Sequence, residues 1–196
     1  MTKHTVTYIK ITLFLACLLP LARAAYILLG GMAVNPIEFI TRSTGTWTLV
    51  MLLAGLAITP LRRLSGANWL IKLRRMLGLF AFFYACLHFT TYIWLDQFFD
   101  LTAVLRDIAK RPFITIGFAA FVLLIPLAAT STDAMLRRLK RNWGRLHRLV
   151  YPIAALGVLH YLWLVKRDLT QPLLYAAVLA VLFGLRLWWR YRPRSA

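Results

Sequence analysis

Acidic residues are scarce in this chain. Its 196 residues include only six aspartates and glutamates against 24 lysines and arginines, which gives a net charge of +18. In a soluble protein such an excess would favour nucleic-acid binding. Here the basic residues fall in short clusters between long apolar runs, 61% of the residues are apolar, and the mean hydropathy is +0.69. A soluble domain is about half apolar and about a quarter charged. The composition therefore predicts a membrane protein and leaves nucleic acid as a weak alternative.

Cysteine is also scarce, and nucleotide-binding motifs are absent. Cys17 and Cys86 both lie inside apolar runs, so they form neither a disulfide framework nor a zinc signature. We expect them to pack as small hydrophobic side chains. The chain has no glycine-rich dinucleotide fingerprint, and therefore no recognisable NAD or FAD domain of its own.

Six apolar segments meet or approach the length of a transmembrane helix, which is about 20 residues with a range from about 17. The first is typical of a signal peptide in its basic start, but it is long, carries Arg23 and lacks a small-residue cleavage site. We interpret it as a retained span. The predicted fold is an all-α membrane protein, a single domain over residues 1–196 with six transmembrane helices. The expected spans are about 9–30, 46–61, 76–95, 113–129, 149–165 and 173–189.

Lysine and arginine are unevenly distributed around these spans, with 17 on one side, six on the other, and Arg23 inside the first span. The positive-inside rule therefore places both termini in the cytoplasm. Five of the six acidic residues fall on the opposite, outer side. The basic inner loops are consistent with contact to anionic lipid or with docking of an acidic cytosolic flavoprotein.

Three of the four histidines, His88, His147 and His160, lie in or at the mouth of apolar segments. An ionisable residue inside a membrane is costly and usually functional. His88 lies fourteen residues after Arg74, which is ~21 Å along a helix, and His160 lies thirteen residues after His147, which is ~20 Å. We therefore expect His88 and His160 to share a depth near the outer face, and His147 and Arg74 to share a depth near the inner face.

Two histidines at one depth on facing helices predict a haem site. Two neutral imidazoles can take both axial positions of a haem iron, and this ligation leaves no open position, which suits electron transfer. The predicted axial ligands are His88 and His160. Zinc is a weaker interpretation because it needs three or four ligands. The remaining alternative is that each histidine only hydrogen-bonds a neighbouring helix.

Three other residues are weaker candidates. His147 is a candidate ligand of an inner haem, although an ideal helix would point it about 140° away from His160. Arg74 is a candidate polar contact at that inner site. Arg23 is a candidate contact for a haem propionate or a quinone, with snorkelling to the membrane surface as its alternative.

Several motifs carry a family resemblance. RRMLGL at 74–79 and YACLH at 84–88 are followed by TSTD at 130–133, WGRLHRLVY at 143–151 and LHY at 159–161. With these segments the chain resembles the ferric-reductase-like transmembrane superfamily. The addition of NPIE at 35–38 and STGTW at 43–47 makes it similar to the MsrQ (YedZ) family within that superfamily. The resemblance covers nearly the whole chain.

The resemblance implies haem b, one copy with a second as an alternative, and a bacterial inner-membrane location. It implies a periplasmic molybdopterin partner, MsrP, that reduces methionine sulfoxide and so supports protein repair. It also implies electrons from the quinone pool or from a cytosolic flavin reductase, and an associated FMN. By position, His88 and His160 match the outer ligands and His147 matches the inner ligand of two-haem relatives. Arg74 stands where those relatives have another inner histidine.

Two further function classes remain open. The first is a self-sufficient ferric or quinone reductase, against which the lack of a nucleotide domain counts. The second is a non-redox transporter or scaffold whose histidines bind substrate or protons; the sequence shows no convincing internal symmetry that would favour it. In the leading interpretation the chain transfers electrons and performs no substrate chemistry itself.

Overall fold

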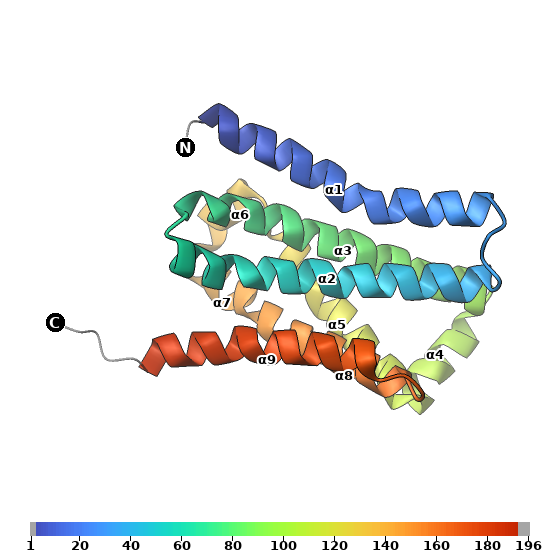
Figure 1. Cartoon of the computed structure of the whole chain (residues 1–196). Helices are drawn as coiled ribbons and strands as arrows, with labels where there is room; N and C mark the ends of the chain where they lie inside the picture. Colours follow the sequence, from blue (N-terminus) through green and yellow to red (C-terminus); the bar gives the residue numbers. More distant parts are fainter. Residues whose placement is uncertain (1–2, 192–196) are drawn as a thin grey trace.

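The computed structural model of the chain describes residues 3–191, and this part is entirely helical (Figure 1). Arg192 and Arg194, which were counted among the inner basic residues, lie outside the described residues. The elements are α1 (Lys3–Leu29), α2 (Pro36–Ser65), η1 (Asn68–Leu73), α3 (Arg74–Thr91), η2 (Tyr92–Asp96), α4 (Leu101–Lys110), α5 (Pro112–Ala129), α6 (Asp133–Leu139), α7 (Arg141–Leu146), η3 (His147–Leu149), α8 (Val150–Leu164) and α9 (Thr170–Tyr191).

Five segments of the described chain are long and apolar enough to cross a membrane. Four of them agree closely with predicted spans in position, and the fifth, α2, is much longer than predicted. The remaining predicted span, at 149–165, corresponds to α8, which has only 15 residues and falls short of the usual length. The five segments are His4–Leu29, Pro36–Ser65, Asn68–Asp96, Pro112–Ala129 and Thr170–Tyr191.

Helix α2 starts well before the span predicted at 46–61, so the segment expected as an outer loop is helical. Asn35 caps the helix by accepting a hydrogen bond from the Glu38 amide at 3.2 Å, and Pro36 occupies the first turn. Both are strong start signals. The prediction was wrong here because Glu38 and Arg42 make the first turns too polar for a hydropathy pattern to include.

The centre of the molecule is a bundle of two helix pairs. Helix α2 packs against α3, and α5 packs against α8; α3 also contacts α5, and α2 contacts α8. Small side chains allow close approach where the helices meet, since Ala81 and Ala154 are fully buried. Helix α9 lies along α2 and α8, and α1 lies on the other side of α2, so the outermost helices flank the bundle (Figure 1).

A partly buried arginine attaches α9 to the bundle. Pro60 lies inside α2 and has no N–H group, so the carbonyl of Leu56 lacks its usual helical donor. The Arg186 guanidinium of α9 donates to this carbonyl and also to the Leu182 carbonyl at 2.6 Å. Its charge also lies over the Tyr151 ring, 5.5 Å from the centroid. A proline in a membrane helix is tolerated when a neighbour supplies the missing donor in this way.

A short amphipathic helix forms the corner between α3 and α5 at the end where the histidines lie. The chain leaves α3 through the π-helical turn η2 and reverses at Phe98 and Phe99, which have positive φ values of 47° and 62°. Asp100 then caps α4 by accepting a hydrogen bond from the Ala103 amide at 3.0 Å. Helix α4 therefore covers one end of the space between α3 and α5.

Candidate haem site

His88 and His160 face each other across the centre of the bundle. His88 lies near the end of α3 and His160 lies near the end of α8. Their ring centroids are 6.3 Å apart and the ring planes are inclined by 71°. The equal depth expected from the helical rise therefore brings these two side chains together.

A backbone carbonyl fixes the orientation of each imidazole ring. Nδ1 of His88 lies 2.9 Å from the carbonyl oxygen of Thr41 in α2, and Nδ1 of His160 lies 2.7 Å from the carbonyl oxygen of Phe113 in α5. A carbonyl oxygen only accepts, so each Nδ1 carries the proton and donates. Each Nε2 then keeps its lone pair, and this pattern is typical of metal-ligating histidines.

A glycine lets each imidazole ring lie directly against the neighbouring helix. A Cβ atom added to Gly45 would lie 3.0 Å from Cε1 of His88, and one added to Gly117 would lie 2.7 Å from Nδ1 of His160. Real side chains do not approach so closely, so only glycine fits at Gly117. Each glycine comes four residues after the carbonyl that its histidine contacts.

The two half-sites are copies of one arrangement. In both, the histidine follows its carbonyl partner by 47 residues. The α2–α3 pair and the α5–α8 pair therefore present the same carbonyl, glycine and histidine at the same register. This is a parallel repeat rather than an inverted one, and the two histidines meet at its centre.

The imidazole rings lie in a cavity of about 500 Å³ between the two helix pairs. Its walls are mostly apolar and include Leu52, Leu124 and Ile153. Polar groups gather at the end toward α4, where Thr41 and Arg111 are among the lining residues. An apolar cavity with a few polar groups at one end is typical of a cofactor site.

The histidine pair fits a bound haem. A metal lies about 2.0–2.1 Å from an imidazole nitrogen, so two axial nitrogens stand ~4 Å apart. The ring centroids, each about 1 Å behind its nitrogen, would then be ~6 Å apart. The 6.3 Å between His88 and His160 agrees with this value. The described part of the chain holds no cluster of three histidine, cysteine, aspartate or glutamate side chains, so it offers no set of ligands for zinc.

His147 and Arg74 lie at the opposite end of the bundle, as their predicted depth implies. His147 lies in the short turn before α8, stacked on Trp143 with ring centroids 3.9 Å apart. The Thr130 hydroxyl donates to the Pro126 carbonyl and so accepts from Nε2 of His147, which is 3.0 Å away. Burial, followed by the positive charge of Arg74, lowers the pKa of His147. Its Nε2 is therefore engaged within the protein.

Arg23 lies away from the histidine cavity. It lines a second, more open cavity of about 730 Å³ between α1 and α2, together with Asn35 and Trp47. Arg42 borders both cavities. The candidate contact between Arg23 and a haem propionate therefore has no support in the geometry, whereas a contact with a molecule in this second cavity stays a prediction.

Sequence reasoning missed the residues that complete the site. Thr41 and Phe113 contribute backbone carbonyls, and Gly45 and Gly117 contribute the space for the rings. Nothing in their side-chain chemistry indicates these roles. The sequence does carry one signal: a glycine precedes each histidine at the same spacing, Gly45 before His88 and Gly117 before His160. This spacing becomes visible only when the segments around the two histidines are aligned with each other.

Comparisons with known proteins agree with this architecture. The ferric reductase like transmembrane component family matches residues 41–158, a range that contains both glycines and His88 and ends just before His160. A relative from Herminiimonas arsenicoxydans, named protein-methionine-sulfoxide reductase heme-binding subunit MsrQ, is 60% identical and covers 96% of this chain and 88% of its own length. The chain belongs to the MsrQ family.

Other relatives in the MsrQ family carry the same printed name. One from Ralstonia nicotianae is 56% identical over 94% of this chain and 87% of its own length. One from Bordetella pertussis is 54% identical over 98% of this chain and 96% of its own length. Membership of the ferric-reductase-like superfamily and of the MsrQ family, expected from the motifs, is therefore confirmed.

Proposed function

We propose that this chain is the haem-binding electron-transfer subunit of a bacterial methionine-sulfoxide reductase system. It takes electrons from the quinone pool or from a cytosolic flavin reductase and passes them to a periplasmic molybdopterin reductase, MsrP. The observation that carries this proposal is the facing pair His88 and His160, each with Nδ1 donating to a carbonyl and Nε2 left free. The relatives, which are named as heme-binding subunits, support it.

His88 and His160 would hold one haem b through their Nε2 atoms. A bound haem supplies reversible one-electron transfer. The two imidazoles would leave the iron no open position and the apolar walls around Leu52 and Leu124 would keep water out, which would disfavour oxygen chemistry. The chain therefore carries electrons, while the reduction of methionine sulfoxide to methionine and water, with two electrons and two protons, belongs to the partner.

The position of the site favours a partner on the outer side. His88 and His160 lie toward the end of the bundle that α4 covers, and the hydrocarbon core is ~30 Å thick. A periplasmic acceptor at this end would be close to the haem, and a quinol in the membrane could reach it from the side. A cytosolic donor would need a second carrier near His147, either a haem or the FMN implied by the resemblance.

We propose that the protein lies in the inner membrane with six spans and both termini cytoplasmic. The basic residues at the end of α2, in η1 and at the start of α3, together with those of α6 and α7, gather at the end of the bundle opposite α4 (Figure 1). The positive-inside rule places that end in the cytoplasm. Helix α8, extended by η3, runs back along α5 and makes the remaining crossing.

A reconstituted electron-transfer assay tests this function. The purified chain in vesicles is reduced with a quinol, and the absorption of the reduced haem is followed on addition of the molybdopterin reductase and methionine sulfoxide. We expect reoxidation only when both are present, with His88→Ala inactive and Lys166→Gln as a surface control. Rapid reoxidation by a ferric chelate alone, unaffected by the reductase, would favour the self-sufficient ferric reductase instead. A colourless protein would favour the transporter.

A further inference from the structure

The cavity has one polar end, which makes it suited to a ligand whose charged groups lie at one edge. Most of the lining is apolar, and its polar residues include Thr41, Gln97 and Arg111 as well as the carboxylate of Asp96. A planar apolar ligand with carboxylates on one side would be oriented by this difference. Haem is such a ligand, so the inference that follows rests on the proposed function and adds how the haem is oriented.

The Thr41 hydroxyl is a buried polar atom without a partner. Its Oγ1 makes no hydrogen bond within residues 3–191, although the Thr41 carbonyl accepts from His88 and the residue lines the cavity. Leaving a buried hydroxyl unpaired carries a desolvation cost that no hydrogen bond offsets. A ligand atom that accepts a hydrogen bond at this point would remove that cost.

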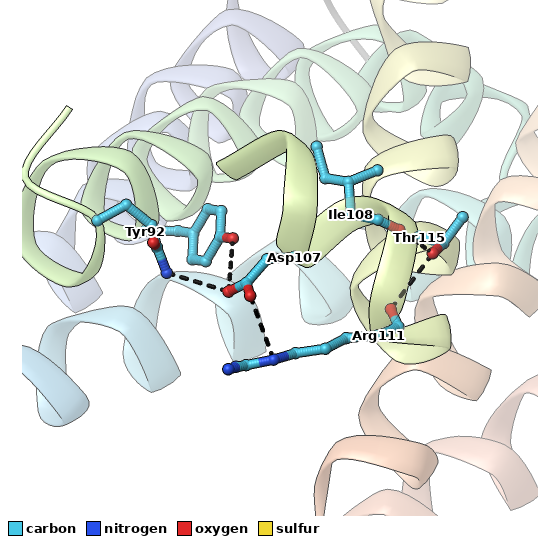
Figure 2. A network of polar contacts seen from close by, with 6 residues as sticks. Tyr92, Asp107, Ile108, Arg111 and Thr115 are labelled. Carbon is cyan, nitrogen blue, oxygen red and sulfur yellow. Dashed lines mark hydrogen bonds and ion pairs between the residues drawn. The ribbon is translucent and has the colours of Figure 1, made fainter. Parts of the chain in front are cut away.

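Arg111 is held at the mouth of the cavity by an almost buried carboxylate. Its Nε lies 3.3 Å from Oδ1 of Asp107, whose side chain is only 16% exposed. Asp107 also accepts from the Tyr92 hydroxyl at 3.3 Å and from Nε2 of Gln97 at 3.1 Å. Figure 2 shows Tyr92 and Arg111 converging on Asp107 from two sides. The guanidinium Nη groups make no hydrogen bond in the described residues.

The polar contacts around Asp107 and Arg111 involve three neighbouring elements. Helix α4 brings Asp107, the turn η2 brings Tyr92, and the Thr115 hydroxyl of α5 donates to the carbonyls of Ile108 and Arg111 (Figure 2). Arg42 also borders the cavity, but its Nη2 is paired with Glu38 at 2.7 Å and its side chain is 68% exposed. The Arg111 side chain is itself 56% exposed, but its partner Asp107 is only 16% exposed, whereas Glu38 is 50% exposed. Of the two cations, Arg111 is therefore the one paired with a carboxylate that the fold holds in place.

We propose that Arg111 and Thr41 bind the carboxylate groups of the haem, and that Asp107 is the positioning residue that holds Arg111 for this contact. With this contact the propionates would lie near Arg111 and Thr41, and the apolar edge of the porphyrin would lie among Leu52 and Leu124, which also line the cavity. An arginine–carboxylate contact is strong and directional. It would therefore favour the haem orientation with the propionates toward Arg111 over the reverse orientation.

The test compares two porphyrins that differ only in the carboxylates. The full-length chain, purified without haem, is titrated with iron protoporphyrin IX and with its dimethyl ester, and the low-spin absorption band is followed. We expect wild type to bind the diacid more tightly. Arg111→Gln and Thr41→Val should each lose about tenfold of this preference, the loss expected for a hydrogen bond to a charged group.

Matched variants separate this contact from a structural effect. Lys110→Gln removes the neighbouring positive charge of α4 and should keep the full preference. Asp107→Asn should lower the preference, and combined with Arg111→Gln it should add nothing, since both act on one contact. The dimethyl ester should bind all variants alike, which shows that each is folded.

Two results would overturn the assignment. Equal affinity of wild type for both porphyrins, or an unchanged preference in both Arg111→Gln and Thr41→Val, contradicts the carboxylate contact while leaving the histidine ligands intact. Failure of wild type to form a low-spin complex with either porphyrin contradicts the proposed function itself, and this assignment with it.

Discussion

Gly117 has no side chain at the point where the His160 ring lies against α5. A methyl group there would lie 2.7 Å from Nδ1 and 2.9 Å from Cε1 of the imidazole. The ring cannot yield without breaking its hydrogen bond to the Phe113 carbonyl. The histidine site therefore depends on a residue with no chemistry of its own, and the same holds for Gly45 and His88.

Replacement of Gly117 by alanine should displace His160 and weaken haem binding. Forcing an extra methyl group into a packed site costs about 1–3 kcal/mol, so we expect roughly a tenfold or greater loss of haem affinity. The amount of haem bound per chain after purification measures this loss of affinity. Gly78→Ala is the matched control, because a Cβ at Gly78 meets nothing within 4 Å. Equal haem content in both variants would contradict the close contact described for Gly117.

His147 is expected to stabilise the fold rather than to hold haem. Its Nε2 is engaged by Thr130, and its ring stacks on Trp143. His147→Ala should leave the haem content and spectrum unchanged, while lowering the free energy of unfolding by ~1 kcal/mol for the lost hydrogen bond. Thermal unfolding and haem quantification check both parts. Loss of about half of the haem on this substitution would instead establish a second haem site.

Some of this site could be predicted from the sequence and some could not. The depth shared by His88 and His160 follows from the fixed rise of a helix. Their contacts with Thr41 and Phe113 depend on which helices become neighbours, and no local pattern in the sequence determines that. Arg111 and Asp107 were seen only as loop charges, because their roles arise when α4 folds over the cavity.

Proline shapes how the helices α2 and α9 are joined. The Leu56 carbonyl, freed by Pro60, takes its hydrogen bond from Arg186. The sequence showed an arginine near the end of the last span, which was counted as an inner charge. Its contact with α2 could not be predicted because it depends on tertiary packing.

Arg186→Leu should destabilise the bundle by about 1–3 kcal/mol, since it leaves the Leu56 carbonyl buried without a donor. In a Pro60→Ala background the helix regains its own donor, so the same substitution should cost less. A double-mutant cycle by thermal unfolding in detergent measures the difference. Strictly additive effects would show that Arg186 does not act through this carbonyl. The haem spectrum should stay unchanged throughout.

The whole bundle consists of two equivalent helix pairs with flanking helices, and its topology depends on α8. This helix has 15 residues, so length alone does not identify it as a span. Its packing along α5, which has 18 residues, and its equivalence to α3 in the histidine register support the proposal that it crosses. The hydropathy pattern predicts six spans, five segments of the described chain are long and apolar enough to cross, and the crossing by α8 stays a prediction.

Cysteine labelling tests this crossing. Asn142→Cys in α7 and Lys166→Cys after α8 both place an exposed thiol on a surface segment, while Cys17 is buried and Cys86 is half-buried. With a membrane-impermeant maleimide added to spheroplasts, only Lys166→Cys should react; after lysis both should react. Labelling of both before lysis, or of neither, would place the two sites on one side and exclude a crossing by α8.

The haem content and the oxidised and reduced absorption spectra of the detergent-purified chain test the central claim most directly. The account predicts a low-spin b-type spectrum with about one haem per chain, since one bis-histidine site is formed. His88→Ala and His160→Ala should each abolish or strongly reduce it. If both variants keep full haem content and an unchanged low-spin spectrum, the pair is not the haem site and the account is wrong.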